Sequence, residues 1–425
     1  MPAIVSQFRR VPRGSPLKPL FAFAAAVFAG SLLIGAPPAS AQLTREAQAR
    51  QEQESQTLDQ FATALDAVSI APDFVGLAVA VVKHGHVALL RTYGVREAGK
   101  PDKVTPDTVF RLASLSKGFA ATLAEMEIRQ GKFLLSDPVA RSVPEFKLRS
   151  PEETDAVTIE DILSHRTGLP PYAYDNLLEA GVPPPDVLGR YAELKLSCPV
   201  GQCYAYQNSA FNMIATVIEK ATGKPYADEL RTRVLEPLGL KTASVGLKGL
   251  MSTGNWARPH RRLHDVWKST TVKDAYYGVP AAGGVNASIT DLATWMIAQM
   301  GGRPDVLSSD ILNDLRKPRT ATPAETQRAR ILRMPVRDTR YGLGWRIYKY
   351  ANHTLFTHSG GVEGYFSQIS WLPESQDGIV ILSNSRGARA SKILPMWLDY
   401  ELNLKKTDWM KLEDLGEATA VGSSE

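Results

Sequence analysis

The chain contains 425 residues, of which 44% are hydrophobic and 22% charged, so it is long enough for one large globular domain or two smaller ones. Its formal net charge is +5. Residues 1–41 hold four of the 49 basic residues and none of the 44 acidic ones, which leaves 45 basic residues and a net charge of +1 in the remainder. This balance excludes a general electrostatic footprint for nucleic acid, and we expect no nucleic-acid partner.

The first 41 residues have the features of a secretory signal peptide. A start with four basic residues precedes the apolar stretch PLFAFAAAVFAGSLLIGA, and the small residues at 39–41 form a cleavage site. We predict a periplasmic or secreted bacterial protein that begins at Gln42 and has no stable membrane span after cleavage. An uncleaved membrane anchor is the alternative.

Residues 42–57 are polar and are expected to form a linker or a frayed helix, and helical apolar spacing follows from 58 to 68. The segment GLAVAVVKHGHVALLRTYG then predicts a β-hairpin that turns at residues 83–86. His84 and His86 are interpreted as turn residues, because no third metal ligand is near them in sequence. We expect no metal and no cofactor, and no P-loop or dinucleotide fingerprint is present.

Helical patterns with Pro- and Gly-rich breaks dominate residues 118–300, and the C-terminal third returns to strands. The order predicts an α/β fold of the α+β type. An antiparallel sheet would be built from the N- and C-terminal segments and flanked by helices, with a mostly helical region inserted at about 125–285. The catalytic domain would span 58–405, and 406–425 would be a tail. The basic segment 316–340 is expected to be a solvated loop, or alternatively to steer an anionic substrate.

The chain has two cysteines, Cys198 and Cys203, which enclose the short loop CPVGQC. After export they would meet an oxidising compartment, where a local disulfide and two free thiols are both open. Two cysteines do not make a zinc site.

Ser114 and Lys117 stand three residues apart in RLASLSKGF, at the start of an apolar helix. Residues at i and i+3 share a helix face, so Lys117 pairs with Ser114, whereas Ser116 points elsewhere. A serine hydroxyl becomes a good nucleophile when a base takes its proton. Lysine is such a base only when it is neutral, which requires its pKa to fall from near 10.4 to about 7 through burial or a neighbouring cation.

Two further motifs add suitable chemistry. Tyr206 and Asn208 in YAYQNS place a phenol for proton relay and an amide for a carbonyl at the start of another helix. In THSGGVEGYFS, His358-Ser359-Gly360-Gly361 ends one strand, and its glycines allow a substrate backbone to approach while leaving N–H groups free for an oxyanion.

Four more segments accompany these motifs in order: ILSHRTGLP at 162–170, EPLGL at 236–240, AAGGVNASITDLATW at 281–295 and YGLGW at 341–345. Together they resemble the serine β-lactamase and penicillin-binding-protein superfamily. The chain is most similar to the branch of class C β-lactamases, low-molecular-weight DD-peptidases and related bacterial esterases. The resemblance extends from about Phe74 to Leu402.

The resemblance implies a role for each matching residue. Ser114 would be the nucleophile that forms an acyl-enzyme, and Lys117 its proton acceptor, although which group is the true base is disputed in related enzymes. Tyr206 would transfer protons to the leaving group and activate the deacylating water. Asn208 would hold the substrate carbonyl, and the backbone N–H groups of Ser114 and Gly361 would form the oxyanion hole.

The sequence departs from most class C β-lactamases at the third motif, where they resemble Lys-Thr-Gly and this chain has His358-Ser359-Gly360. A lysine is a fixed cation, whereas His358 is mostly neutral at pH 7. Recognition of a substrate carboxylate would therefore lie elsewhere, with Arg386 and Arg389 as candidates.

The resemblance thus implies an exported serine hydrolase with an acyl-Ser114 intermediate. It would act on a small-molecule or peptidoglycan-derived substrate, which is a D-Ala-type peptide, a short ester or a β-lactam. The alternative is a penicillin-binding sensor that is acylated without efficient turnover. The sequence does not set an oligomeric state.

Overall fold

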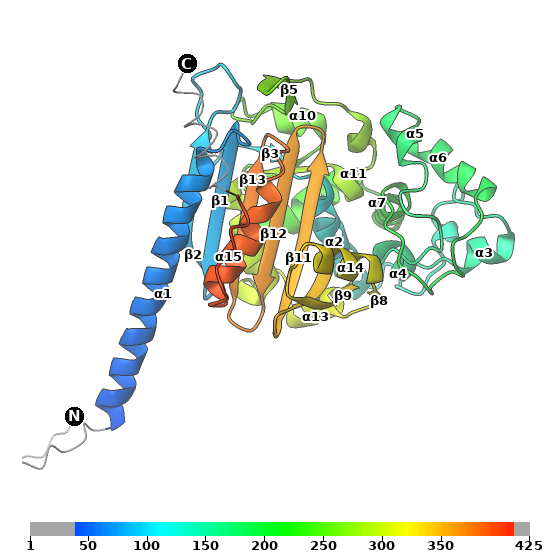
Figure 1. Ribbon diagram of the computed structural model, residues 1–425. Coiled ribbons are helices and arrows are strands. Elements are labelled where there is room, and N and C mark those ends of the chain that lie inside the picture. Colours follow the sequence, from blue (N-terminus) through cyan, green and yellow to red (C-terminus); the bar gives the residue numbers. More distant parts are fainter. Residues whose placement is uncertain (1–38, 412–425) are drawn as a thin grey trace, which may run out of the picture. The chain divides into compact units, whose positions relative to one another are not determined.

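The centre of the computed structural model is an antiparallel sheet of eight strands in the order β2-β1-β13-β12-β11-β10-β9-β8 (Figure 1). Strands from the two ends of the chain meet in it, because β1 pairs with both β2 and β13. This confirms the predicted sheet. Its strands are β1 (Gly76–Lys83), β2 (His86–Gly94), β8 (Thr320–Ala321), β9 (Val336–Tyr341), β10 (Arg346–Tyr350), β11 (His353–Val362), β12 (Tyr365–Leu372) and β13 (Asp377–Ser383).

The structure describes residues 39–411, and from Glu54 onward the described chain is one compact unit. The predicted signal peptide lies outside this range except for its last three residues, which begin helix α1 (Ala39–Ser69). The segment 42–57 therefore belongs to a helix and is not an extended linker, because its Gln, Glu, Arg and Ala residues favour helix. Within residues 39–411, no helix combines the length and apolar character needed to cross a membrane.

Helices α1 and α15 (Ile393–Glu401) cover one face of the large sheet, and α2 (Ser116–Arg129) and α12 (Ile289–Ile297) cover the other. Most of the remaining helices form the inserted region. They are α3 (Pro151–Ala156), α4 (Ile159–Leu163), α5 (Asp175–Glu179), α6 (Pro184–Arg190), α7 (Ser209–Thr222), α8 (Tyr226–Leu230), α9 (Glu236–Leu238), α10 (Gly246–Met251), α11 (Pro280–Gly283), α13 (Ser309–Arg316) and α14 (Pro323–Ile331).

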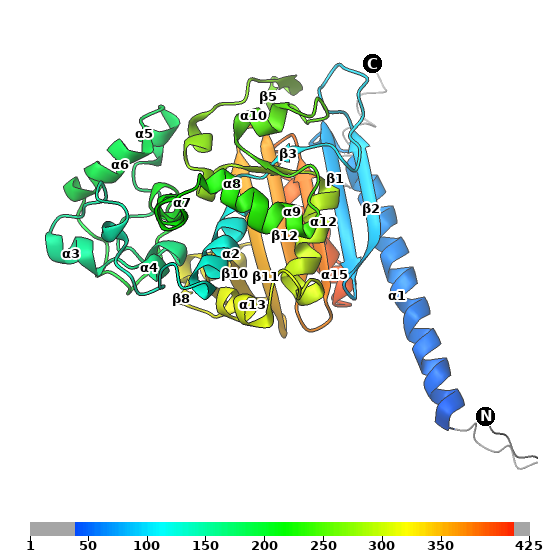
Figure 2. The same cartoon turned by 180° about the vertical axis from the view of Figure 1, so that it is seen from behind.

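Strand β1 shows how the two faces are built. Successive side chains of a strand point to opposite faces. Leu77 and Val79 belong to the core that includes residues of α1 and α15, whereas Ala78 and Ala80 belong to the core that includes α2 and α12. Figure 2 shows α2 and α12 on this second face of the sheet. The near-continuous apolar run of β1 thus reflects burial on both sides.

Short strands complete the fold away from the large sheet. They are β3 (Phe110–Arg111), β4 (Ser244–Val245) and β7 (Val285–Ala287), which form a small sheet, and the hairpin of β5 (His260–Leu263) with β6 (Val266–Ser269). Strand β3 ends beside the nucleophile motif, and β7 holds it in place, as described below.

The basic segment 316–340 is not a solvated loop, because it contains β8, α14 and most of β9. Between its charged residues the segment holds a short strand with a buried face, which consists of Val336, Thr339 and Tyr341 in β9. Thr339 Oγ1 also donates to the carbonyl of Thr322 at 2.8 Å. Arg319 is largely buried and pairs with Glu160 at 3.3 Å.

The N-cap of helix α12 allows a test of how much a single cap contributes to stability. Ser288 Oγ, at the N-cap position, accepts a hydrogen bond from the backbone N–H of Asp291 at 3.3 Å. We expect Ser288→Ala to lower the free energy of unfolding by about 1 kcal/mol, measured by urea denaturation. Ser309→Ala, in the first turn of α13, should change it far less. Equal effects of the two substitutions would contradict this account of the cap.

Candidate active site

Ser114 lies in a 3₁₀ turn, Ala113–Leu115, that leads directly into α2. Ala113 has a φ of 49°, a left-handed conformation that costs energy for a residue with a Cβ and turns the next side chain out of the core. Ser116 stabilises this turn, because its hydroxyl donates to the carbonyl of Ala113 at 2.6 Å and accepts from the N–H of Val285 at 2.9 Å. Ser116 is thus engaged in structural hydrogen bonds of this turn, and the pairing of Lys117 with Ser114 is the one that helix geometry predicted.

Lys117 is fully buried, and its Nζ lies 2.8 Å from Asn208 Oδ1, 3.0 Å from the carbonyl of Ala282 and 3.5 Å from Ser114 Oγ. Burial lowers the pKa of Lys117 well below the usual value of a lysine, and nearby Arg346 lowers it further, while Asp175 opposes them. A neutral amine has two N–H groups and one lone pair. The two N–H groups match the two carbonyl oxygens, and the lone pair is left for the hydroxyl of Ser114.

The YGLGW motif packs behind this lysine. Gly344 has a φ of 73°, and a Cβ on it would lie 2.6 Å from the backbone carbonyl of Lys117. The indole of Trp345 packs against Gly118, where a Cβ would come within 2.6 Å of the indole ring. The glycines therefore allow a close approach that fixes the first turn of α2.

Tyr206 is held by His165 of the ILSHRTGLP motif. The two residues that flank Tyr206 both donate hydrogen bonds to His165. The N–H of Ala205 donates to the His165 carbonyl at 2.9 Å, and the N–H of Gln207 donates to His165 Nδ1 at 3.2 Å. The two rings lie 4.4 Å apart, and Lys117 Nζ is 4.7 Å from the Tyr206 ring centre. Burial raises the pKa of Tyr206, while Arg346 and a hydrogen bond to Ser114 act against this rise.

Cys198 and Cys203 form a disulfide. The loop that it closes is tied to the segment after His165, because the N–H of Gly201 donates to the Arg166 carbonyl at 2.8 Å. Just before the loop, the N–H of Ser197 donates to the Gly168 carbonyl, also at 2.8 Å. The disulfide thus anchors the chain three residues before Tyr206.

His358 is buried in β11, and its hydrogen bonds define its protonation state. Arg346 Nη1 lies 3.0 Å from His358 Nε2, and a guanidinium can only donate, so Nε2 carries no proton. The proton is on Nδ1, which lies 2.9 Å from the carbonyl of Ser359. Burial, followed by the field of Arg346, lowers the pKa of His358 well below its usual value, which favours the neutral ring.

Arg346 is a site residue that the sequence reasoning missed. It follows YGLGW at the start of β10, pairs with Glu325 at 2.9 Å and has its guanidinium carbon 5.3 Å from the Tyr206 ring centre. The fixed cation expected at residue 358 in class C enzymes therefore comes from the neighbouring strand. The feature that brings Arg346 to the site is the register of the β10–β11 hairpin, which places Arg346 opposite Thr357, the residue before His358.

The edge of β11 beyond this point is open. Pairing with β10 ends at Arg346 and Thr357, whereas β11 continues to Val362, and no other described strand pairs with that edge. A Cβ on Gly360 would lie 2.1 Å from the carbonyl of Leu112, so only glycine allows the strand to lie against the nucleophile turn. Extended substrate backbone fits such an edge.

A cavity of about 930 Å³ unites these groups. Its lining includes two of the three predicted catalytic residues, Ser114 and Tyr206, together with Ser359, Gly360 and Gly361. Lys117 does not line the cavity, but its Nζ contacts Asn208, which does. The predicted oxyanion donors of Ser114 and Gly361 thus both belong to this cavity. No group of three or more potential metal ligands clusters anywhere in residues 39–411.

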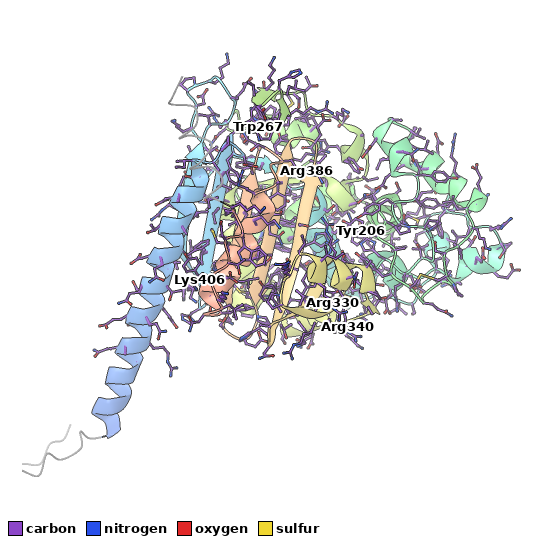
Figure 3. The ribbon with its side chains drawn as sticks, viewed as in Figure 1. Tyr206, Trp267, Arg330, Arg340, Arg386 and Lys406 are labelled. Carbon is purple, nitrogen blue, oxygen red and sulfur yellow. A yellow bond between two sulfur atoms is a disulfide. The ribbon has the colours of Figure 1, made fainter. Side chains whose placement is uncertain are left out.

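The two arginine candidates for carboxylate recognition differ. Arg386 is exposed, lines the cavity and comes within 3.2 Å of where a Cβ on Gly361 would stand. Figure 3 shows Arg386 near the tip of the β11 arrow and Tyr206 lower, to the right of this strand. Arg389 is directed away, because its guanidinium pairs with Asp73 and donates to the carbonyl of Met410. We therefore exclude Arg389 from the site.

A model of the β-lactamase family matches residues 52–397. The chain belongs to the β-lactamase family. It is 28% identical over 364 residues to the unguisins hydrolase ungD' of Aspergillus campestris, with 80% of this chain and 65% of that protein covered. It is 24% identical over 326 residues to protein flp of Staphylococcus aureus, with 75% of this chain and 61% of that protein covered. The chain thus spans less than two thirds of the length of each of these relatives. The family and the hydrolase among these relatives support the conclusion that this chain is a hydrolase.

Solved structures confirm the predicted fold. The octameric penicillin-binding protein homologue from Pyrococcus abyssi superposes with a TM-score of 0.71 at 22% identity, covering 82% of this chain and 78% of that chain. The crystal structure of SurE matches with a TM-score of 0.65 at 20% identity, covering 84% and 78%.

Arg346→Gln tests the electrostatics of the site. The substitution removes a cation that lowers the pKa of Lys117, so this pKa should rise and the neutral amine should become scarcer at a given pH. We expect the acidic limb of the kcat/KM profile for p-nitrophenyl acetate to move to higher pH, measured over about pH 5 to 9. The double variant with Glu325→Gln leaves no unpaired carboxylate and should move in the same direction. A limb that stays in place in both variants would refute this role.

The disulfide gives a second test. Cys198→Ser combined with Cys203→Ser should lower the free energy of unfolding by about 2 kcal/mol, because the loop then has more freedom in the unfolded chain. Urea denaturation measures the change, and wild-type protein with dithiothreitol serves as the matched control. An unfolding free energy that is unchanged in both samples would argue against the disulfide.

Proposed function

We propose that this hydrolase is an exported serine hydrolase that cleaves an amide, ester or lactam carbonyl through a covalent acyl-Ser114 intermediate. The observation that carries the proposal is the set of contacts of Lys117 Nζ. Two carbonyl oxygens match the two N–H groups of a neutral amine, which would leave the lone pair for Ser114, whose Oγ lies 3.5 Å from Nζ. Such a lysine is suited to take the proton of the serine.

In the proposed acylation, Ser114 Oγ gives its proton to Lys117 and bonds to the substrate carbonyl carbon. The backbone N–H groups of Ser114 and Gly361 stabilise the oxyanion. When the tetrahedral intermediate collapses, the bond to the leaving nitrogen or oxygen breaks. Tyr206 relays the proton to that atom, and Arg346 beside its ring favours the phenolate during the relay.

In the proposed deacylation, water attacks the acyl carbon and gives its proton to Tyr206 or Lys117. The bond to Ser114 Oγ breaks, the serine recovers its proton and the acid product leaves. Asn208 contributes to both steps. Its Nδ2 donates one hydrogen to Asp175 at 2.7 Å, which leaves the second hydrogen for a substrate carbonyl.

Several features support an extended substrate of the D-Ala peptide type, ahead of a short ester and a β-lactam. The open edge of β11 offers backbone groups to a peptide. The cavity is larger than a small ester needs. Arg386 lies beside Gly361 and is available for a carboxylate. The disulfide and the signal-peptide pattern support export.

Mass spectrometry of the mature protein after exposure to a fluorescent penicillin tests the proposal. We expect one acyl adduct on Ser114 and none on Ser114→Ala, and this variant should lose at least about 1000-fold in kcat on esters or D-Ala peptides. Ser116→Ala is the matched control and should still be acylated. No adduct and no turnover on any ester, lactam or D-Ala peptide would overturn the proposal. A stable adduct without turnover would favour a penicillin-binding sensor.

A further inference from the structure

The charges that line the cavity are segregated. Its free carboxylates, Asp175 and Glu179, stand four residues apart on α5 and so share one helix face. Its arginines come from β10, from α14 and from the segment after β13. Figure 1 shows α14 and β13 apart from α5. A third carboxylate, Glu325, is already paired with Arg346. The part of the cavity at α5 is therefore acidic.

Asp175 has bonding capacity that the protein does not use. The residue is only 9% exposed, and its Oδ2 accepts from Asn208 Nδ2 at 2.7 Å. Its Oδ1 is buried and has no hydrogen-bond partner among the described residues. A buried carboxylate oxygen without a donor is unfavourable. Positioning Asn208 explains one oxygen of Asp175 and leaves the other for a ligand.

The surroundings of Asp175 define the ligand's chemistry. Glu179 is exposed at the rim and accepts from the hydroxyl of Tyr276 at 2.9 Å. Ionised carboxylates accept hydrogen bonds and do not donate them, so a matching group must bring N–H or O–H donors and preferably positive charge. A primary ammonium supplies three such donors. The missing third acidic or histidine ligand argues against a metal ion here.

The contact between Asp175 and Asn208 indicates which part of a substrate Asp175 would meet, and this step rests on the proposed function. Tyr206 relays a proton to the leaving group, and Arg346 stands at its ring, so the leaving group lies toward Arg346. Asp175 bonds to Asn208, the residue proposed to hold the carbonyl of the acyl part, so a group bound by Asp175 would belong to that part.

We propose that Asp175 and Glu179 form a subsite for a cationic amine on the acyl part of the substrate. The enzyme would then act on aminoacyl amides or esters. Ser114 Oγ bonds to the carbonyl carbon, the bond to the leaving nitrogen or oxygen breaks and the leaving group takes the serine proton. Water then releases an amino acid or an amino-terminal acyl product, and the amine itself does not react.

Binding of alkylboronic acids, which form adducts with Ser114, tests this subsite. Each ammonium-bearing alkylboronic acid in a series of increasing chain length is compared with the boronic acid that has a methyl group in place of the ammonium. Titration calorimetry gives both affinities. We expect at least one pair to favour the ammonium by about tenfold, and Glu179→Gln and Asp175→Asn to reduce that ratio several-fold.

The ratio separates charge recognition from a structural role. If Asp175 only positions Asn208, Asp175→Asn weakens both members of a pair alike and the ratio stays the same. Asp186→Asn, on the neighbouring helix α6, removes the same charge outside the cavity and should leave the ratio unchanged. A wild-type enzyme with no ammonium preference in any pair, or a preference that survives both substitutions, would overturn the subsite.

The same titrations distinguish failure of the subsite from failure of the proposed function. Boronic acids that bind wild type but not Ser114→Ala, without preference for an ammonium, would refute the subsite and leave the acyl-enzyme proposal standing. If no boronic acid binds in a way that depends on Ser114, the nucleophile assignment fails, and the subsite that rests on it fails too.

Discussion

The burial of one amine, Lys117 Nζ, is the constraint on which the site depends. A charged ammonium in this position would be expensive, and a neutral one is useful as a base. The protein enforces the burial with its fold. Helix α2 lies inside the core, Gly344 and Trp345 close off its first turn, and Asn208 and Ala282 take up the N–H groups. Core packing here lowers the pKa of Lys117 as well as stabilising the fold.

The replacement of a lysine by His358 divides one task between two residues. Arg346 carries the permanent charge and donates a hydrogen bond to the neutral ring of His358. The His358 ring in turn packs against the rings of Tyr341 and Tyr206. Glu325 balances the arginine. The positive field at Tyr206 is therefore present, but its source is engaged by two partners and is not a free cation in the cavity. This arrangement makes Arg386, which is exposed, the more available cation for an anionic group.

Local patterns predicted much of the fold and the centre of the site. The apolar runs of β1 and β13 indicated buried strands at both chain ends, and helical spacing paired Ser114 with Lys117. Arg346 was missed because its contact with His358 depends on the register of a hairpin, which no motif encodes. Asp175 was missed because α5 has five residues and no periodic pattern. In segment 316–340 the density of charge concealed a strand of only six residues.

The place of β13 in the sheet has a consequence for how the molecule is made. The strand lies between β1 and β12, so the first hairpin of the domain obtains its second neighbour only after nearly all of the chain is present. Sequence-distant pairing of this kind slows folding, because a long loop must close before the contact forms. A partly synthesised chain would have its nucleophile helix but no finished sheet to support it. The cavity beside β11 would thus be complete only after β13 has joined the sheet.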